Sequence, residues 1–510
     1  MAGPSQLRAG QILSRNEKHA IWLASQPFVQ RARKFQSRRY RQFTAEGRQH
    51  DYGSFKETDY QEMCTIDMGT VKDVTCEHCG ALRFPREKSK ICCQNGKVKL
   101  DPLPQPPDGI YKYYGNDRKC KAFKDHIREY NNVHGMASLG LDHALLGSPD
   151  SNPFQPNFRI MGGVYHDIGS VQALPGHKPA YAQIYFHDTD YQIKTRKGGY
   201  RGDSSLDESI VYDLTLALNE VNPYVNVFRS AAELIQTSDQ SDKARIVISN
   251  DKSKIPEGAH QRTYNSPVAS EVAGIIFGDL EKEERDRPVV VSYKNNGRLE
   301  KISTNHRSYD PLLYVLLFPH GTDGWSPHLK KEKGYTMLDF YRYRLNQRAD
   351  EFLMTSRRLT QQYAVDQWNK IEKDKADWQR HHQKQLRAEK YIGFMDAQDN
   401  EDMANVGKKV ILAPTMYYSP RWYKELLQDA ISIVRQLGKP DFFVTMTCNP
   451  NWPEIKNSLM EGEQAHERPD LCCRVFELYL QELMDDLFKK HVLGKVTGYC
   501  ITIEFQKRGE

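Results

Sequence analysis

The clearest pattern of hydrophobic and polar positions lies in the C-terminal part of the chain. Apolar residues recur there every three or four positions, as on one face of a helix. They are Trp422, Leu426, Ala430, Val434 and Leu437. Ser419 and Pro420 predict the start of this helix, because serine can cap the first amides and proline fits the first turn. Gly438 predicts its end.

A strand, a second helix and a second strand are predicted after this helix. Residues 441–447 are rich in Phe and Val and stop before Pro450, which is typical of a strand. A helix is expected from about Asp470 to Lys490. From Val496 onwards, apolar and polar residues alternate with period two, which predicts a strand with one buried face. This order favours an α+β sheet domain.

The middle of the chain mixes helical and strand patterns and predicts an α/β domain. Residues 123–132 and 207–220 have apolar residues at helical spacing, whereas 181–188 and 244–248 read as strands. The apolar run Leu312–Phe318 is expected to be buried. Residues 337–391 contain neither glycine nor proline, so long helices are expected there, either as a basic surface that cradles DNA or as a solvated connector.

Composition excludes a membrane protein and says little about partners. The chain has 510 residues, which is enough for several domains, and its longest apolar run is far short of a transmembrane helix. Lys and Arg (72) barely exceed Asp and Glu (66), so an argument for nucleic acid must rest on where charges cluster. The N-terminus lacks an apolar signal core, which predicts a nuclear or cytoplasmic protein that is not secreted.

The segment 31–41 is the strongest local cluster of positive charge. Its cations are interleaved with Phe35 and Tyr40 and are not interrupted by an acid; they are Arg31, Arg33, Lys34, Arg38, Arg39 and Arg41. Such a segment can neutralise phosphates while its rings stack on bases, or it can act as a nuclear-import signal. A solvated, disordered basic tail is the alternative.

Four clustered cysteines predict a structural zinc site. Cys76 and Cys79 form a Cys-x-x-Cys pair, and Cys92 and Cys93 follow. Adjacent residues of an extended segment point to opposite faces, so Cys92 and Cys93 need a local twist to share one ion. Cys76, Cys79 and Cys92 are therefore the first three expected ligands. The fourth is left open among Cys93, Cys64, His78 and Cys120.

Two runs near the C-terminus, Phe442 to Pro453 and Tyr499 to Arg508, resemble the first core strands of rolling-circle (HUH-type) endonucleases. Shorter phrases in matching order extend a resemblance to Helitron transposases, in their "helicase-like" N-terminal part, over about residues 70 to 510. These phrases are Ile127-Arg128 through Tyr130-Asn131, Ser138-Leu139-Gly140, Tyr165-His166 through Ile168-Gly169, and Gln183-Ile184-Tyr185.

The resemblance implies a DNA-nicking enzyme whose chemical groups are absent from this sequence. In the family, a His-x-His motif after the second strand holds a divalent cation while a tyrosine attacks phosphorus. None of the seventeen histidines forms a His-x-His motif, and the chain reaches Glu510 where the motif is expected. A phosphate-binding Gly-x-x-x-x-Gly-Lys-Ser/Thr loop is also missing. We therefore expect that the chain has no catalytic residues and no divalent cation site. We expect it to be the N-terminal part of the family protein, ending just before the catalytic motif.

The expected organisation has five parts. Residues 1–60 form a basic, largely disordered tail, 61–100 a zinc-knuckle-like segment, 109–300 the α/β domain, 301–410 a helical connector, and 411–510 an incomplete HUH-endonuclease-like (ferredoxin-like) sheet domain. The prolines between Pro102 and Pro107 are expected to form a stiff linker. Because that sheet is cut after two strands, residues 420–510 are expected to be protease-sensitive.

Three functions follow from these features. The leading expectation is a Helitron transposase fragment that binds DNA, single strands preferred, without nicking it. A non-enzymatic chromatin or protein-interaction module derived from a transposon is the alternative. A metal-dependent nuclease that uses scattered carboxylates is the third.

Overall fold

The computed structural model describes residues 68–141, 164–168, 173, 177–197, 206–236, 244–248, 273–277, 289–292, 300–349, 351–383, 412–413, 415–417 and 419–503. Its contacts divide the chain into two compact units. The core unit comprises Gly69–Ile371 and Pro453–Leu471. The C-terminal unit comprises Glu372–Trp452 and Cys472–Glu510, together with Met1–Met68. The units do not follow the predicted domain limits, and those limits stay a prediction.

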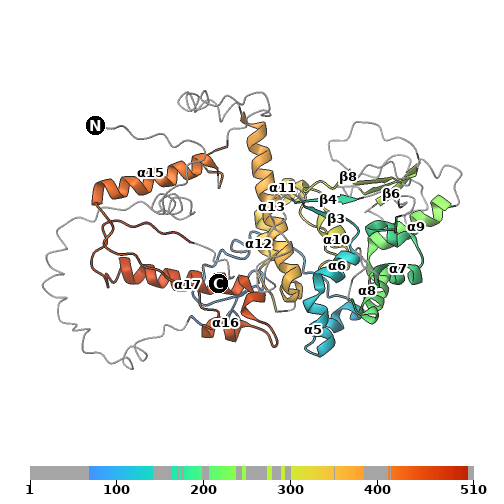
Figure 1. Cartoon of the computed structure of the whole chain (residues 1–510), viewed down its shortest axis with the longest axis horizontal. Coiled ribbons are helices and arrows are strands. Elements are labelled where there is room, and N and C mark those ends of the chain that lie inside the picture. Colours follow the sequence, from blue (N-terminus) through green and yellow to red (C-terminus); the bar gives the residue numbers. More distant parts are fainter. Residues whose placement is uncertain are drawn as a thin grey trace. The chain divides into compact units, whose positions relative to one another are not determined.

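The first half of the core unit is mainly helical (Figure 1). Its helices are α4 (Asp108–Tyr111), α5 (Arg118–Asp125), α6 (Ile127–His134), α7 (Thr189–Lys197), α8 (Glu208–Val221) and α9 (Pro223–Gln236), with short 3-10 helices η2 (Lys112–Tyr114) and η4 (Tyr181–Phe186). The helices predicted at 123–132 and 207–220 are thus confirmed. Asp207 caps α8 by accepting hydrogen bonds from the amides of Ser209 and Ile210.

Two predictions for this half are wrong. Residues 181–188 are not a strand, because Tyr181–Phe186 form η4, whose buried Tyr185 donates its hydroxyl to the carbonyl of His134, 2.5 Å away. The proline-rich segment is not a linker between domains. Leu103 is buried in the core, and the carbonyl of Gln105 lies 2.8 Å from Nε2 of His320.

The described strands form three small antiparallel sheets. β1 (Val74–Thr75) pairs with β2 (Leu82–Arg83). β4 (Val164–Ile168) lies between β3 (Ser138–Leu141) and β8 (Glu300–Lys301), and β5 (Ala244–Ile248) lies between β6 (Ala273–Phe277) and β7 (Val289–Ser292). The strand predicted at 244–248 is confirmed. Helices and small sheets together agree with the predicted mixed α/β class at this coarse level.

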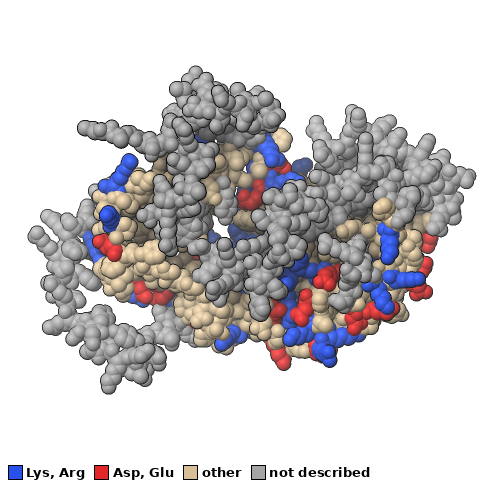
Figure 2. Space-filling model, in the orientation of Figure 1, with Lys and Arg blue, Asp and Glu red and all other residues tan. Residues whose placement is uncertain are grey.

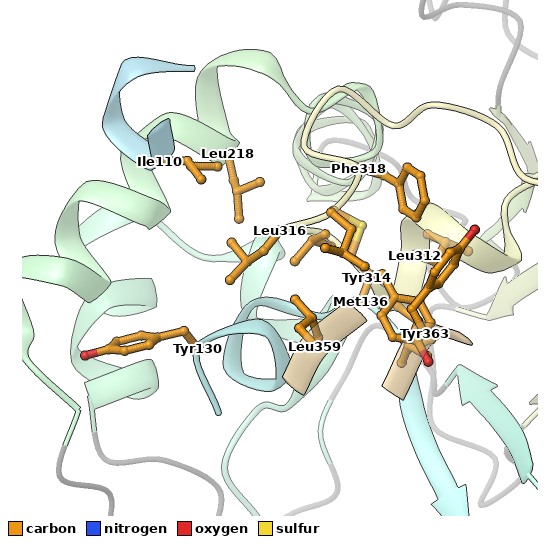
Figure 3. Close-up of a cluster of buried hydrophobic side chains, with 14 of the residues drawn as sticks. Ile110, Tyr130, Met136, Leu218, Leu312, Tyr314, Leu316, Phe318, Leu359 and Tyr363 are labelled. Carbon is orange, nitrogen blue, oxygen red and sulfur yellow. The ribbon is translucent and has the colours of Figure 1, made fainter. Parts of the chain in front are cut away.

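The second half of the core unit supplies the centre of its hydrophobic core (Figure 3). Its elements are α10 (Tyr309–Leu313), α11 (Pro327–Lys333), α12 (Met337–Arg344), η7 (Leu353–Thr355) and α13 (Arg357–His381), and the last helix continues into the C-terminal unit. The run Leu312–Phe318 is buried throughout, as predicted. The prediction of long helices in residues 337–391 is confirmed by α13, which has 25 residues, whereas α12 has only eight.

A fully buried network of charged and phenolic groups lies inside this core. The ammonium of Lys370 lies 3.3 Å from Oδ1 of Asp310, and both side chains are 0% exposed. Tyr341 and Tyr363 donate their hydroxyls to Asp310, and Tyr309 and Tyr314 donate theirs to Asp366. Burial raises the pKa of Asp310 and lowers that of Lys370, while their mutual attraction opposes both shifts. Because the ions are buried, loss of one partner would leave the other uncompensated.

The segment Pro453–Leu471 belongs to the core unit although both of its flanks belong to the other unit. It contains α16 (Pro453–Ser458) and η9 (Ala465–Glu467). Arg357 reaches it through Glu467, with 3.1 Å between Nη1 and Oε1. Arg468, 1% exposed, donates to Gln347 over 2.6 Å and pairs with Glu463 and Asp470. Buried arginines therefore attach this segment to the core unit.

The C-terminal unit contains α15 (Pro420–Leu437) and α17 (Pro469–Phe488), the second of which begins in the core unit. Ser419 caps α15 by accepting a hydrogen bond from the amide of Trp422, 3.1 Å away, and Gly438 ends it at φ 88°, as predicted. The apolar face of α15 is not a buried inner face. Trp422 is buried, but Val434 is 42% and Leu437 38% exposed.

The expected HUH-like sheet is not found among the described residues of this unit. Residues 441–447 and 496–503 are not hydrogen-bonded into strands, and 504–506 lie outside the described residues. Phe442, Phe443 and Val444 are exposed. Phe- and Val-rich composition favours a strand, but a strand requires a partner with which to exchange hydrogen bonds.

None of the described helices combines the length and the apolar character that crossing a bilayer requires.

Candidate metal centre

The first half of the candidate centre is a knuckle between β1 and β2. The amide of Cys76 donates to the carbonyl of Ala81, and the amide of Gly80 donates to the carbonyl of Cys76, both over 2.8 Å. Gly80 has a φ of +70°, which glycine adopts without strain. This double turn brings Cys79 back over Cys76, so the Cys-x-x-Cys spacing becomes a pair of thiols on one side of the hairpin.

The second half is a turn at residues 91–97, and it resolves the difficulty that the adjacent cysteines posed. The segment is not extended, because Gln94 and Asn95 adopt φ values of 53° and 56°. The amide of Gly96 donates to Sγ of Cys93 over 3.2 Å. In this tight turn both Cys92 and Cys93 face the knuckle, and both are buried. Two adjacent cysteines cannot easily share one ion when they lie in a strand. That limit does not apply to this turn.

The four sulfur atoms have the spacing of a metal cluster. Sγ atoms of Cys76, Cys79, Cys92 and Cys93 all lie within 4.8 Å of one another. Cys93 lies 3.7 Å from Cys76 and 3.9 Å from Cys92, sulfur to sulfur. A zinc ion with four thiolates at about 2.3 Å has tetrahedral edges of about 3.8 Å. The donor set and the spacing therefore fit a zinc ion of the structural type.

The other residues considered for the fourth position do not join the cluster. Cys120 is buried elsewhere, where its thiol donates to the carbonyl of Lys112 over 3.2 Å. His78 is exposed and is not among the clustered donors. Cys64 lies outside the described residues, as do Arg31, Arg33, Lys34, Arg38, Arg39 and Arg41. Cys93 is therefore the fourth member that the structure brings together with the first three.

Backbone amides already favour a thiolate at one position of the cluster. Burial alone would raise the pKa of Cys76, but hydrogen bonds from the backbone of His78 and Cys79, and from neighbouring thiols, lower it to about 7. Burial and the neighbouring thiols raise the pKa values of Cys92 and Cys93. Without a cation the four sulfurs cannot all be ionised together, whereas a dication would compensate their charge.

A set of contacts from beyond residue 325 fixes the cysteine segment to the core unit. We call residues 69–101 the cysteine module. Arg348 donates from Nε to the carbonyl of Cys79 over 2.8 Å and stacks on Tyr343, with its guanidinium 3.8 Å from the ring centroid. The amide of Leu82 donates to the carbonyl of Gln347 over 2.8 Å. Tyr335 and Tyr343 pack against the cysteines.

These supporting residues were missed by sequence reasoning. Arg348 lies more than two hundred positions from Cys79, and nothing in its local sequence distinguishes it from the other arginines of the region. Arg348 also pairs with Glu351 over 3.0 Å. Hydrogen bonds to ligand residues orient a metal site. The cysteine module is thus a part of the core unit and is not an independent zinc finger.

Taken together, the geometry brings four cysteines into one cluster that could hold a metal ion such as zinc, within a mainly helical unit. Residues 340–510 match the family model described as the Helitron helicase-like domain at the N-terminus. No curated protein matches the chain.

The family match confirms the Helitron resemblance for residues 340–510. Its limits do not coincide with a folding unit, because residue 340 lies inside α12 and the matched range contains parts of both units. The start of the matched region carries Tyr343, Gln347 and Arg348, which hold the cysteine module. The module and the Helitron-type region are therefore joined through direct contacts within the core unit.

Proposed function

We propose that this chain is a DNA-binding part of Helitron-type transposition, in which Cys76, Cys79, Cys92 and Cys93 hold a structural zinc ion. The chain binds DNA and does not nick it. The clustering of four sulfur atoms within 4.8 Å carries the metal assignment. The match of residues 340–510 to the Helitron domain supports the assignment to transposition.

In this proposal the four cysteines act as ligands and their surroundings keep them in place. A bound zinc ion supplies a tetrahedral cross-link between the knuckle and the 91–97 turn. The amide of Gly96 and the guanidinium of Arg348 hold the two turns so that all four sulfurs converge. No water or substrate position is left open when four cysteines occupy the ligand positions, which makes the role structural.

Metal content tests the first part of the proposal. The purified full chain should contain about one zinc ion per molecule, as a four-cysteine site requires. Cys93→Ser should lose most of it and become easier to unfold in urea. Cys120→Ser is the matched control, because Cys120 is another buried thiol but lies outside the cluster, and it should keep the metal. Equal zinc content in wild type and Cys93→Ser would contradict the assignment.

Affinity for DNA tests the second part. The segment 31–41, with six cations and two aromatic rings, supports a preference for single strands, since bases stack on exposed rings. Binding of a labelled oligonucleotide should weaken steeply as salt increases. With magnesium or manganese, no covalent adduct and no opening of a supercoiled plasmid are expected. A nicked plasmid would contradict the proposal and favour the third hypothesis, a metal-dependent nuclease that uses scattered carboxylates.

One observation favours a second candidate, a protein-interaction module. Phe442, Phe443 and Val444 are 64%, 76% and 50% exposed, and exposed apolar side chains that adjoin one another are common where proteins bind. Retention of a protein partner that is insensitive to salt, without retention of DNA, would favour this candidate over the first.

A further inference from the structure

We propose that the cysteine module and α11 together form a contact surface for the backbone of double-stranded DNA. We call Lys97, Lys99, Lys330, Lys331 and Lys333 the basic face. The inference rests on the proposed DNA-binding function and names for it a surface made of residues other than those of the segment 31–41.

The two parts of the basic face are adjacent. The amide of Lys99 donates to the hydroxyl of Tyr335 over 3.1 Å, and Tyr335 follows α11 directly after Gly334. Tyr335 packs with Cys76, Cys92 and Val98 in one cluster. The segment 97–99 therefore lies beside the end of α11, at which the three helical lysines are placed.

The lysines of the segment 97–99 point outwards together. Val98 is 2% exposed, whereas Lys97 and Lys99 on either side of it are exposed. Lys330, Lys331 and Lys333 are exposed as well. Lysines near a helix C-terminus complement its dipole, which accounts in part for those on α11 but not for Lys97 and Lys99.

The lysines of the basic face have no acidic partner among the described residues. Some other exposed lysines are paired, as Lys197 is with Glu208, Lys375 with Glu372 and Lys489 with Asp485. Figure 2 likewise shows Lys and Arg mixed with Asp and Glu at the lower right, where Figure 1 has α5, α7 and α8. Unpaired cations held close together repel one another, and an anionic partner relieves this repulsion.

The charge excess extends over the whole cysteine module. Residues 69–101 contain seven Lys and Arg and four acids, and α11 adds three lysines against Glu332. Two of the acids are engaged in their own turns, since Asp73 accepts a hydrogen bond from Thr70 and Glu87 from the amide of Phe84. The net negative charge of a zinc ion with four thiolates offsets only part of this excess.

The absence of exposed rings favours duplex DNA over single strands at this surface. Within residues 69–101 and 325–335 the aromatic side chains are Phe84, Trp325 and Tyr335, and all three are buried. Single-strand binding normally adds base stacking on exposed aromatic residues to a basic groove. A surface that carries lysines without aromatic rings contacts phosphates only. Phosphates are denser along a duplex than along a single strand.

Substitution of four lysines tests the proposal in the full chain. Lys97, Lys99, Lys331 and Lys333 are changed together to Gln, and a duplex oligonucleotide is titrated over a range of salt concentrations. The slope of log affinity against log salt should fall in magnitude by about 3.6, since each of the four lost phosphate contacts removes about 0.9. Affinity at low salt should fall about tenfold or more. The variant's zinc content and urea midpoint should equal those of wild type, because these side chains are exposed.

A matched control carries the same number of substitutions outside the basic face. Lys121, Lys194, Lys373 and Lys439 are also exposed, and none forms an ion pair within the described part of the chain. Changing these four to Gln should leave the slope for duplex DNA within about one unit of wild type. An equal loss in both quadruple variants would overturn the proposal, since it would mean that only net charge matters.

A third variant separates this surface from the proposed function. Replacing the six cations of segment 31–41 by Gln should weaken single-strand binding more than duplex binding, whereas the basic-face variant should do the reverse. If wild type binds DNA and the basic-face variant keeps its duplex affinity, the inference falls and the proposed function stands. If wild type retains no DNA at low salt, both fall.

Discussion

Helices α8 and α15 have similar sequence patterns and opposite surroundings. Both carry one apolar face, and both begin with a capping side chain, Asp207 in α8 and Ser419 in α15. In α8, Ile210, Val211 and Leu214 are 0% exposed, whereas in α15 only Trp422 is buried. An amphipathic pattern and a cap specify a helix. They do not specify whether another element covers its apolar face.

The same contrast holds for charged residues. Lys370 in α13 lies within a sequence rich in Lys and Glu that reads as a solvated helix, yet it is completely buried beside Asp310. Stability should therefore depend strongly on the core unit and weakly on the exposed face of α15.

The largest expected effect is that of Lys370→Met. The substitution removes the cation that pairs with the buried Asp310, which should lower the free energy of unfolding by about 3–5 kcal/mol. Urea unfolding of the full chain, followed by hydrogen exchange in α10 and α13, measures it. Lys373→Met, three residues along the same helix and exposed, should change stability by less than about 0.5 kcal/mol. Equal effects would mean that the buried network does not stabilise the core unit.

A decrease in pH should weaken the core unit through two buried histidines. Burial and Arg196 lower the pKa of His134 to about 3, and burial lowers that of His306 to about 4. His306 accepts at Nδ1 from the amide of Ser308, so its ring is neutral in the native state. The unfolded chain protonates both rings near pH 6.5. Stability should therefore be full above this pH and fall towards pH 4, by up to about 1 kcal/mol per pH unit for each histidine.

Unfolding midpoints at pH 7.0 and 5.5 measure this loss. His134→Gln/His306→Gln should unfold at a midpoint that varies less with pH than that of wild type, while His126→Gln, at an exposed site, should keep the wild-type dependence. A double variant with the full wild-type dependence would show that other groups cause it.

The smallest expected effect comes from a matched pair of Val→Ser substitutions. Val211→Ser places a hydroxyl in the core at a 0% exposed site and should cost about 2–3 kcal/mol. Val434→Ser, at a 42% exposed site on α15, should cost less than about 0.5 kcal/mol. A loss above about 1 kcal/mol for Val434→Ser would show that the α15 face is covered in solution.

Local signals allowed a good part of the fold to be predicted from sequence. The limits of α15 follow from Ser419, Pro420 and Gly438, whose effects need no distant residue. Four cysteines could be assigned to one site, but the way in which Cys92 and Cys93 both reach it depends on positive φ values at Gln94 and Asn95. Those values are set by the tight turn as a whole.

The features that were not predicted depend on residues far apart in sequence. The strand expected at 181–188 is a 3-10 helix because Tyr185 is held by His134 and Arg196. The strands expected at 441–447 and 496–506 had the right composition, but pairing is a property of two segments and not of one. Arg348 could not be connected with Cys79 from any local pattern. The roles of Arg31, Arg33, Lys34, Arg38, Arg39 and Arg41 stay a prediction.

The path of the chain through the two units determines how the units can be expressed separately. The polypeptide leaves the core unit after Ile371, returns to it for Pro453–Leu471 and leaves again. A stop codon placed after residue 371 would therefore not release an intact core unit, because it would discard the segment in which Glu467 and Arg468 bind Arg357 and Gln347. Separate expression of this unit calls for an internal deletion that replaces residues 372–452 with a short linker. For the same reason, recombination at a single breakpoint cannot exchange either unit between related genes.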